Sequence, residues 1–137
     1  MTFLTERLAE LRRHLEHLRG LRQKVAGPES LQSDLSLHND VLFSLLMVCQ
    51  LVIDIAGELS ARRGERFENY AEAIRNLARD ARFAPPMIRV LERLPGFRNV
   101  LVHEYVALDF SRVVKALDEL EPIDAFAEAV RRIESES

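Results

Sequence analysis

The sequence is poor in the residues that build disulfides, tight turns and sheets. Its 137 residues include one cysteine, five glycines, five prolines and no tryptophan. Because Cys49 is alone, no internal disulfide can form, and a reducing compartment is the simpler expectation. No alternation of apolar and polar residues persists long enough for a strand, and no Asn-Gly or Asp-Gly hairpin signal occurs. With 47% apolar and 30% charged residues, the composition is that of a globular, helix-rich chain.

Signals for export, membrane insertion and several enzyme classes are also missing. Charged residues appear by position 6, with no continuous apolar region or small-residue cleavage site, so a cytoplasmic protein is expected. The longest apolar stretch, residues 41–56, contains Gln50 and Asp54 and is too short and too polar to span a bilayer. The chain has no phosphate-cradling glycine loop and no Gly-x-Ser-x-Gly element. Nucleotide hydrolysis and serine hydrolase chemistry are therefore not expected.

The spacing of apolar residues predicts an all-α fold, an up-and-down bundle of about five helices in a single domain over residues 1–137. Leucines at alternating steps of four and three predict a first helix over residues 3–25. A long helix over residues 37–62 is apolar nearly all the way round. Such a helix is covered on most sides, so one partner helix cannot be enough.

Polar and helix-breaking residues mark the connections of the first half. Residues 28–34 are expected to form a loop, and Ser33 or Ser36 could cap the long helix that follows. Gly64 is expected to end that helix. A short amphipathic helix is then predicted over residues 69–80.

Prolines divide the second half of the chain. Pro85 opens a further helical segment, which Pro95 and Gly96 interrupt. At that point the chain either kinks or starts a new helix, with helical character to about residue 106. Asp109 is expected to cap a last helix over residues 110–133 that is kinked or split by its proline at position 122. The tail from about residue 134 to residue 137 is expected to fray.

The net charge of −3 conceals an uneven distribution. Residues 62–98 contain nine arginines and five acidic residues, whereas residues 111–137 contain four basic and seven acidic residues. Seventeen of the nineteen basic residues are arginine. Its planar guanidinium group binds phosphate in a bidentate manner and stacks on bases. An arginine-rich composition also arises from a high genomic GC content, so it does not by itself indicate a nucleic-acid ligand.

The stretch GFRNVLVHEYVALDF, residues 96–110, contains four polar side chains at close spacing: Arg98, Asn99, His103 and Tyr105. On a regular helix, Asn99 and His103 share a face, whereas Arg98 and His103 lie about 140° apart. Two arrangements could bring the arginine and the histidine to one substrate. Either the Pro95–Gly96 break changes the register of Arg98, or a twofold-related second chain supplies the other group.

These residue types suit the cleavage of an RNA phosphodiester without a metal. A histidine that titrates near neutral pH can take a proton from a ribose 2′-hydroxyl or give one to the leaving 5′-oxygen. An arginine can bind the non-bridging phosphate oxygens, where negative charge grows in the transition state. His103 and Arg98 are therefore the candidate catalytic residues, and Tyr105 could position the phosphate or stack on a base.

Other polar residues have simpler interpretations. Asp54 lies in an apolar helix and needs a partner there, so we expect it to form a buried pair with an arginine, with Arg98 as one candidate. His14 and His17 are three residues apart but lack further ligands at metal-binding spacing, which favours solvated surface over a metal site. His38 suits a helix cap. Tyr70 is expected in the core or at a helix start, and the alternative is that it lines an RNA cleft.

The run FRNVLVHEY resembles the signature of the HepT-like ribonuclease toxins in the HEPN superfamily: arginine, four residues, histidine, any residue, tyrosine. The order of features agrees over nearly the whole chain, from a leading amphipathic helix through a long apolar helix and a tyrosine before a short helix to an acidic closing helix. One feature differs from the family pattern. Pro95 stands just before the motif, where a residue compatible with a continuous helix is expected, so the local geometry of Arg98 could differ from that in the family.

The resemblance implies a homodimeric, metal-independent endoribonuclease of a toxin–antitoxin system, with Arg98 and His103 at the dimer interface and no cofactor. Its partner would be a small nucleotidyltransferase antitoxin that transfers AMP from ATP to Tyr105 and so blocks the RNA site. Asn99 would orient the arginine or the histidine. Apart from the resemblance, the place of Asp54 in an apolar helix favours a supporting role for it over direct catalysis. Two alternatives stay open: a helical dimer that binds a nucleotidyltransferase without cleaving RNA, and a structural bundle whose motif residues are ordinary surface groups.

Overall fold

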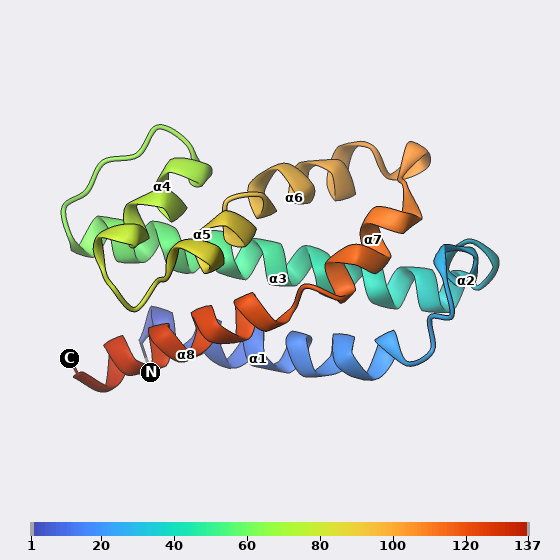
Figure 1. The fold of residues 1–137 in the computed structure, drawn as a ribbon, viewed down its shortest axis with the longest axis horizontal. Helices are drawn as coiled ribbons and strands as arrows, with labels where there is room; N and C mark the ends of the chain where they lie inside the picture. The colour runs from blue at the N-terminus through green and yellow to red at the C-terminus, as the bar shows by residue number, and fades with distance from the viewer. Residues whose placement is uncertain (1, 137) are drawn as a thin grey trace.

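The computed structural model describes residues 2–136, which form eight α-helices, two 3-10 turns and no strand (Figure 1). The all-α prediction is confirmed. The number of helices exceeds five because the shorter segments between breaks are helices of their own. All five prolines lie in first turns, where a missing N–H costs no hydrogen bond: Pro28, Pro85, Pro86, Pro95 and Pro122.

Helix α1 (Phe3–Arg22) places one leucine seam against the rest of the molecule. The seam is buried along its whole length: Leu4, Leu8, Leu11, Leu15, Leu18 and Leu21. The Thr2 side chain caps the helix by accepting a hydrogen bond from the N–H of Thr5. The helix ends three residues earlier than predicted, and Val25 remains buried beyond its end.

The predicted loop after α1 is a short helix instead. Residues Pro28–Ser33 form α2, which starts at its proline. The predicted caps Ser33 and Ser36 are wrong, because the Asp34 carboxylate accepts the hydrogen bond from the N–H of Leu37. His38 is not the cap either: its ring lies edge-on to Phe110.

Helix α3 (Leu35–Arg62) runs the length of the molecule and is the centre of the core (Figure 1). It contacts four other α-helices, α1, α2, α4 and α6, so the prediction that one partner helix could not cover it is confirmed. By length and hydropathy α3 could cross a membrane, yet 56% of its most apolar window is buried inside the protein, which is typical of a core helix. Gly64 follows it with a φ of 67°, a left-handed conformation that suits glycine.

The chain then forms α4 (Tyr70–Asn76), the 3-10 turn η1 (Leu77–Arg79), α5 (Pro85–Leu91) and α6 (Leu94–His103). The Asn69 side chain caps α4. In Figure 1 these elements lie on one side of α3 and α1 lies on the other. The α-helix ends at His103, short of the predicted end at about residue 106, and Tyr105–Ala107 form the 3-10 turn η2.

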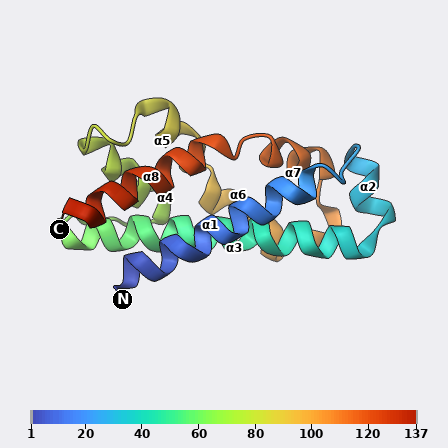
Figure 2. The same cartoon turned by 90° about the horizontal axis from the view of Figure 1, so that it is seen from below.

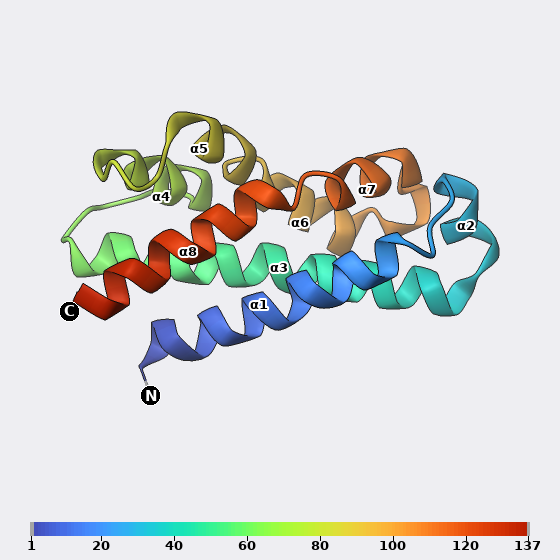
Figure 3. The same ribbon diagram turned by 60° about the horizontal axis from the view of Figure 1, so that its bottom comes forward.

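The last predicted helix is split at its proline, as one of the two expectations had it. Asp109 caps α7 (Phe110–Leu117) through the N–H of Ser111, and α8 (Glu121–Glu136) follows. Helix α8 contacts α1 and α5, and Figures 2 and 3 show it alongside α1.

The tail does not fray over residues 134–136, because Glu134 forms an ion pair with Arg62 and accepts a hydrogen bond from Thr2. The expectation for residue 137 lies outside the described residues.

Candidate functional site

Helix α6 brings the motif residues onto the surface of the core. Leu94 and Leu101 are buried and hold the helix against α3, and Pro95 lies in the first turn. Of the two expectations for the Pro95–Gly96 break, the new helix start is confirmed. The helix then runs without interruption through His103, so Arg98 keeps its regular register.

Arg98 is half-buried and is held from two sides. Its Nε donates a hydrogen bond of 3.1 Å to Oε1 of Gln50, and its Nη1 donates one of 3.1 Å to Oδ1 of Asn99. The amide of Gln50 in turn donates from Nε2 to Oδ1 of Asp54 at 2.9 Å. The four side chains therefore form one chain of hydrogen bonds from α3 to α6. The remaining guanidinium nitrogen, Nη2, makes no hydrogen bond within residues 2–136 and can serve a ligand.

The expectation for Asp54 needs correction. Asp54 is half-buried and forms no ion pair with Arg98 among the described residues. Gln50 lies between them, one helical turn from Asp54, and accepts from the arginine. This arrangement follows from burial, since a half-buried carboxylate that keeps some water contact does not need a salt bridge. Gln50 is the residue whose role the sequence did not reveal, although its i, i+4 spacing to Asp54 in an apolar helix was a signal.

His103 is the last residue of α6 and is exposed. Its imidazole makes no hydrogen bond or ion pair within residues 2–136, so both ring nitrogens are open to a substrate. The next tyrosine, Tyr105, lies in η2 with 62% of its surface exposed. Because the helix has ended, Tyr105 does not share a helical face with Arg98, as a helix to residue 106 would have required.

Within one chain, Arg98 and His103 do not converge. Five residues apart on a continuous helix, they leave the axis about 140° apart, and the structure has no bend between them. The interpretation in which the Pro95–Gly96 break brings them together is therefore wrong. The structure places Arg98 against α3 and leaves His103 to face solvent.

A partly exposed stripe on α3 continues the surface around Arg98. Phe43, Met47, Gln50 and Asp54 follow each other at steps of three and four, so they share one side of the helix. Phe43 is 58% exposed, and Met47, Gln50 and Asp54 are half-buried. Beyond α6, Val106 is 89% exposed. These residues place uncovered apolar surface beside the motif.

The other candidates lie away from this site. His17 is exposed and bonds Asp40 at 2.7 Å, whereas His14 is half-buried and bonds the Ser44 hydroxyl at 3.0 Å, so only His17 fits the surface prediction. Burial lowers the pKa of His14. Within the part of the chain that the structure covers, no three His, Cys, Asp or Glu residues are placed to bind one metal ion. Tyr70 starts α4 and packs near Phe67, which confirms the helix-start interpretation.

Cys49 is buried, as predicted, and its burial raises the pKa of the thiol to about 12. It lies next to Gln50 on α3 and lines a cavity between α3, α6 and α7. A protonated, buried thiol is a poor nucleophile, so Cys49 has no catalytic role in this arrangement.

Comparison with known proteins gives consistent results. A family model described as ribonuclease HepT-like matches residues 8–130. The mRNA nuclease HepT of Shewanella oneidensis is 24% identical over 131 residues, which cover 93% of this chain and 96% of that protein. A protein of Archaeoglobus fulgidus provisionally named an RNase is 29% identical over 113 residues, covering 82% of this chain and 86% of that protein.

Solved structures with the same fold agree closely in shape. The tri-AMPylated HEPN toxin of Shewanella oneidensis in complex with its MNT antitoxin matches with a TM-score of 0.81 at 21% identity, covering 96% of this chain and 99% of that one. A toxin–antitoxin structure with AMP-PNP matches with a TM-score of 0.81 at 20% identity, covering 94% and 97%. At these identities the likeness shows that the HEPN helical fold is shared.

Proposed function

This chain belongs to the family of HepT-like ribonucleases, and from that premise we propose that it is a metal-independent endoribonuclease, the toxin of a toxin–antitoxin pair. The observation that carries the proposal is the placement of Arg98 and His103 on one surface helix, the first held by Gln50 and Asn99 and the second free of protein partners in the described range. The named relatives support the activity, because one is named an mRNA nuclease and the other is provisionally named an RNase.

In this proposal each side chain has a chemical task. His103 takes the proton from the ribose 2′-hydroxyl as that oxygen attacks the phosphorus, and the imidazolium so formed gives this proton to the departing 5′-oxygen as its bond to phosphorus breaks. Arg98 donates hydrogen bonds to the non-bridging oxygens, where negative charge develops. Gln50 and Asn99 fix the guanidinium plane, so that little conformational freedom is lost when the phosphate binds. Asp54 in turn orients the Gln50 amide.

We also propose that the working site is composite and belongs to a twofold homodimer. Arg98 and His103 diverge within one chain, so Arg98 of one protomer and His103 of its partner would act on one phosphate. The stripe of Phe43 and Met47 on α3, together with Val106, offers the apolar surface that such a dimer would bury. A closed dimer with two equivalent sites follows from one isologous contact.

Regulation by AMP transfer fits the position of Tyr105. The tyrosine is 62% exposed two residues beyond His103, so a nucleotidyltransferase antitoxin could reach its hydroxyl, and the added phosphates would place negative charge where RNA must bind. A relative of the same fold is tri-AMPylated in complex with its MNT antitoxin. With an RNA substrate and a nucleotidyltransferase as partner, we propose that the protein acts in the cytoplasm.

The first experiment tests the chemistry. The purified protein is expected to cleave RNA in the presence of EDTA, and His103→Ala is expected to reduce the rate by about 10²- to 10⁴-fold, the usual contribution of a general acid or base. Far-UV circular dichroism should be unchanged, since the imidazole is exposed and makes no bond within residues 2–136. Cleavage that persists in His103→Ala contradicts the proposal, and tight antitoxin binding without any cleavage selects the non-catalytic dimer.

The second experiment tests the composite site by mixing two inactive variants, Arg98→Ala and His103→Ala, after unfolding and refolding together. If each site takes its arginine and histidine from different protomers, half of the sites in a mixed dimer are intact, and about a quarter of the wild-type activity should return. If both residues of a site come from one chain, no activity returns. Size-exclusion chromatography of each variant checks that both still form dimers.

The third experiment tests the modification. Incubation with ATP and a nucleotidyltransferase antitoxin should increase the mass by one or more AMP units, and Tyr105→Phe should prevent the increase. Tyr70→Phe is the matched control, because Tyr70 is also exposed but lies at the start of α4. An unchanged mass increase in Tyr105→Phe contradicts this part of the proposal.

A further inference from the structure

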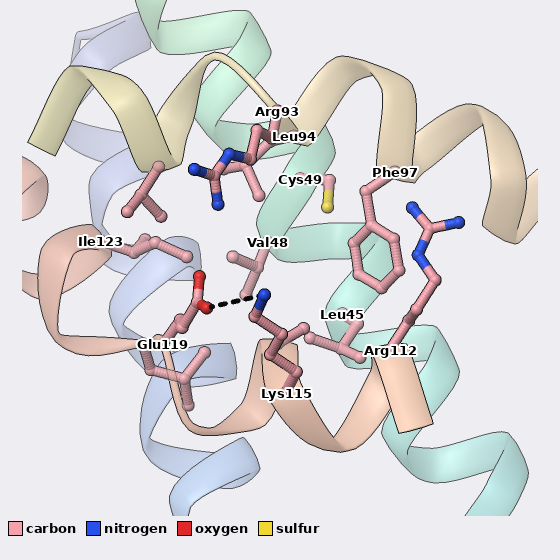
Figure 4. Close-up of a pocket in the computed structure, with 13 residues that line it drawn as sticks. Leu45, Val48, Cys49, Arg93, Leu94, Phe97, Arg112, Lys115, Glu119 and Ile123 are labelled. Atoms are coloured by element: carbon pink, nitrogen blue, oxygen red, sulfur yellow. Dashed lines mark ion pairs between the residues drawn. The ribbon is translucent and has the colours of Figure 1, made fainter. Parts of the chain in front are cut away.

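A cavity of about 220 Å³ lies between α3, α6, α7 and the start of α8 (Figure 4). Its inner wall is apolar and is formed by Leu45, Val48 and Cys49 of α3 together with Leu94 and Phe97 of α6. Figure 4 shows the Phe97 ring standing in the wall. A flat or compact apolar group can therefore enter the space between α6 and α7.

The mouth of this cavity is positively charged. Arg93, Arg112, Lys115 and Glu119 line it, and the only carboxylate among them lies 4.0 Å from the ammonium group of Lys115. Arg93 and Arg112 form no ion pair with any described residue, although most arginines of this chain do. The guanidinium of Arg112 lies 5.8 Å from the centre of the Phe97 ring. Two unpaired guanidinium groups at an apolar pocket suit a ligand that has both a ring and anionic groups.

The cavity adjoins the candidate site through two pairs of neighbouring residues. Cys49 lines the cavity, and the next residue of α3, Gln50, holds Arg98. Phe97 lines the cavity, and the next residue of α6 is Arg98 itself. Because consecutive Cα atoms are about 3.8 Å apart, the cavity lies within the span of a few nucleotides from a phosphate on Arg98. A ligand that continues from that phosphate over α6 would reach it.

We propose that this cavity is a base-binding subsite of the RNA substrate, which rests on the ribonuclease activity proposed above. One unstacked base enters between α6 and α7 and packs against Phe97, while Arg93 and Arg112 bind the phosphates on either side of it. Proteins read single-stranded RNA by stacking splayed bases on aromatic rings and arginine planes. The subsite would select unpaired RNA and set the position of the cut relative to the bound base.

Filling the cavity tests the base. Ala116 lines it from α7, and Ala116→Leu would occupy part of its volume with a residue that α7 tolerates. The control is Ala125→Leu, an exposed alanine of α8 outside the cavity. The substrate is a single-stranded oligonucleotide cut at one position, prepared as a series with one abasic nucleotide at each position in turn.

For the wild type, the abasic nucleotide should lower kcat/KM by about tenfold at one position near the cut, the value of one stacked base. Ala116→Leu should lower kcat/KM by a similar factor for the intact RNA, with no further loss when that same base is missing. Ala125→Leu should retain the wild-type profile. The two losses are expected not to add when the base is missing and the cavity is filled in the same experiment. A purely structural effect of Ala116→Leu would instead lower kcat/KM equally for the intact and the abasic RNA.

Removing a charge tests the phosphate contacts. Arg112→Gln should weaken binding of the oligonucleotide to the His103→Ala protein and reduce the slope of log affinity against log salt concentration by about 0.7 to 1. Arg132→Gln is the control, because Arg132 is also exposed and forms no ion pair in the described range, but it lies on α8.

The outcomes separate the subsite from the activity. Cleavage with a flat abasic profile, or an Ala116→Leu variant with the full wild-type profile, overturns the subsite and leaves the ribonuclease proposal intact. A protein that neither cleaves nor binds the oligonucleotides overturns both. If laurate binds the wild type but not Ala116→Leu, and RNA cleavage is the same in both, the cavity serves an apolar acid and the base subsite is wrong.

Discussion

Two sides of this molecule use arginine in opposite ways. On α1, α3 and α8, most guanidinium groups form an ion pair with a carboxylate, and half of them reach another segment of the chain, as Arg22 does with Asp118 and Arg62 with Glu134. On the side formed by α5, α6 and α7, the arginines form no ion pair with any residue from 2 to 136: Arg89, Arg93, Arg98 and Arg112. Pairs such as these two connect segments far apart in the chain, whereas a guanidinium group without a carboxylate keeps at least one N–H donor for a ligand, as Nη2 of Arg98 does.

The same two sides differ in how they treat apolar residues. The leucine seam of α1 is buried against α3, whereas Val102, Tyr105 and Val106 remain exposed at the end of α6 and just beyond it. A monomer rarely leaves several large apolar side chains together in water without a use for them. On the first side, folding of one chain buries the apolar residues. On the second side, a partner chain, an RNA or both would have to cover them. The following predictions test this difference, from the largest expected effect to the smallest.

Cys49 is buried and lines the cavity between α3, α6 and α7. The rate at which its thiol reacts therefore measures how often this part of the structure opens. Because burial raises the pKa of its thiol to about 12, iodoacetamide at pH 8 should modify the folded protein about a thousandfold more slowly than the urea-unfolded protein. Mass spectrometry over time gives both rates. Fast modification of the folded protein would mean that α6 and α7 separate readily.

Core truncation should separate the two sides by stability. Leu11 is fully buried, so Leu11→Ala should lower the free energy of unfolding by about 2–5 kcal/mol. Val106→Ala should change it by less than about 0.5 kcal/mol at low protein concentration, since this side chain is 89% exposed. Urea denaturation measures both. A Val106→Ala effect that grows with protein concentration would sharpen the comparison by placing Val106 in the dimer interface.

Gln50 of the core helix α3 accepts a hydrogen bond from Arg98 of α6 and so connects the two sides. Gln50→Leu removes the acceptor of the Arg98 Nε hydrogen bond, and kcat for RNA should fall by about tenfold, the usual value of a hydrogen bond to a charged group. KM and the unfolding midpoint should change less. Gln32→Leu, an exposed position on α2, is the control. Equal kcat values for Gln50→Leu and the wild type would contradict a positioning role for Gln50.

The surface ion pair between Arg22 and Asp118 should give the smallest effect. The hydrogen bond from Arg22 lowers the pKa of the Asp118 carboxyl, so its contribution to stability is present above the unfolded-state pKa of about 3.9 and is lost as pH falls through the lower folded-state value. Because both groups are exposed, we expect Asp118→Asn to cost about 0.2–1 kcal/mol at pH 7. The difference from the wild type should shrink in urea denaturation as the pH falls below about 3.9.

Much of the fold could be predicted because its signals are local. Helix periods, caps and proline positions depend on neighbours a few residues away, which is why the long helix, the Asn69–Asp80 segment and the Asp109 cap were found. Two predictions were wrong at helix ends. Asp34 caps α3, where Ser33 or Ser36 was expected to do so, and α6 ends at His103 and not near residue 106. A difference of one hydrogen bond decides such cases, and spacing does not reveal it.

By itself, the sequence determined the all-α class, the buried cysteine and the four motif residues, because composition and periodicity carry that information. Only the tertiary structure decided that Gln50 stands between Asp54 and Arg98, that Arg98 and His103 diverge, and which arginines lack a carboxylate. These facts depend on contacts between residues as far apart as Gln50 and Arg98 in the chain. Packing of one helix on another sets such contacts, and no local pattern in the sequence specifies them.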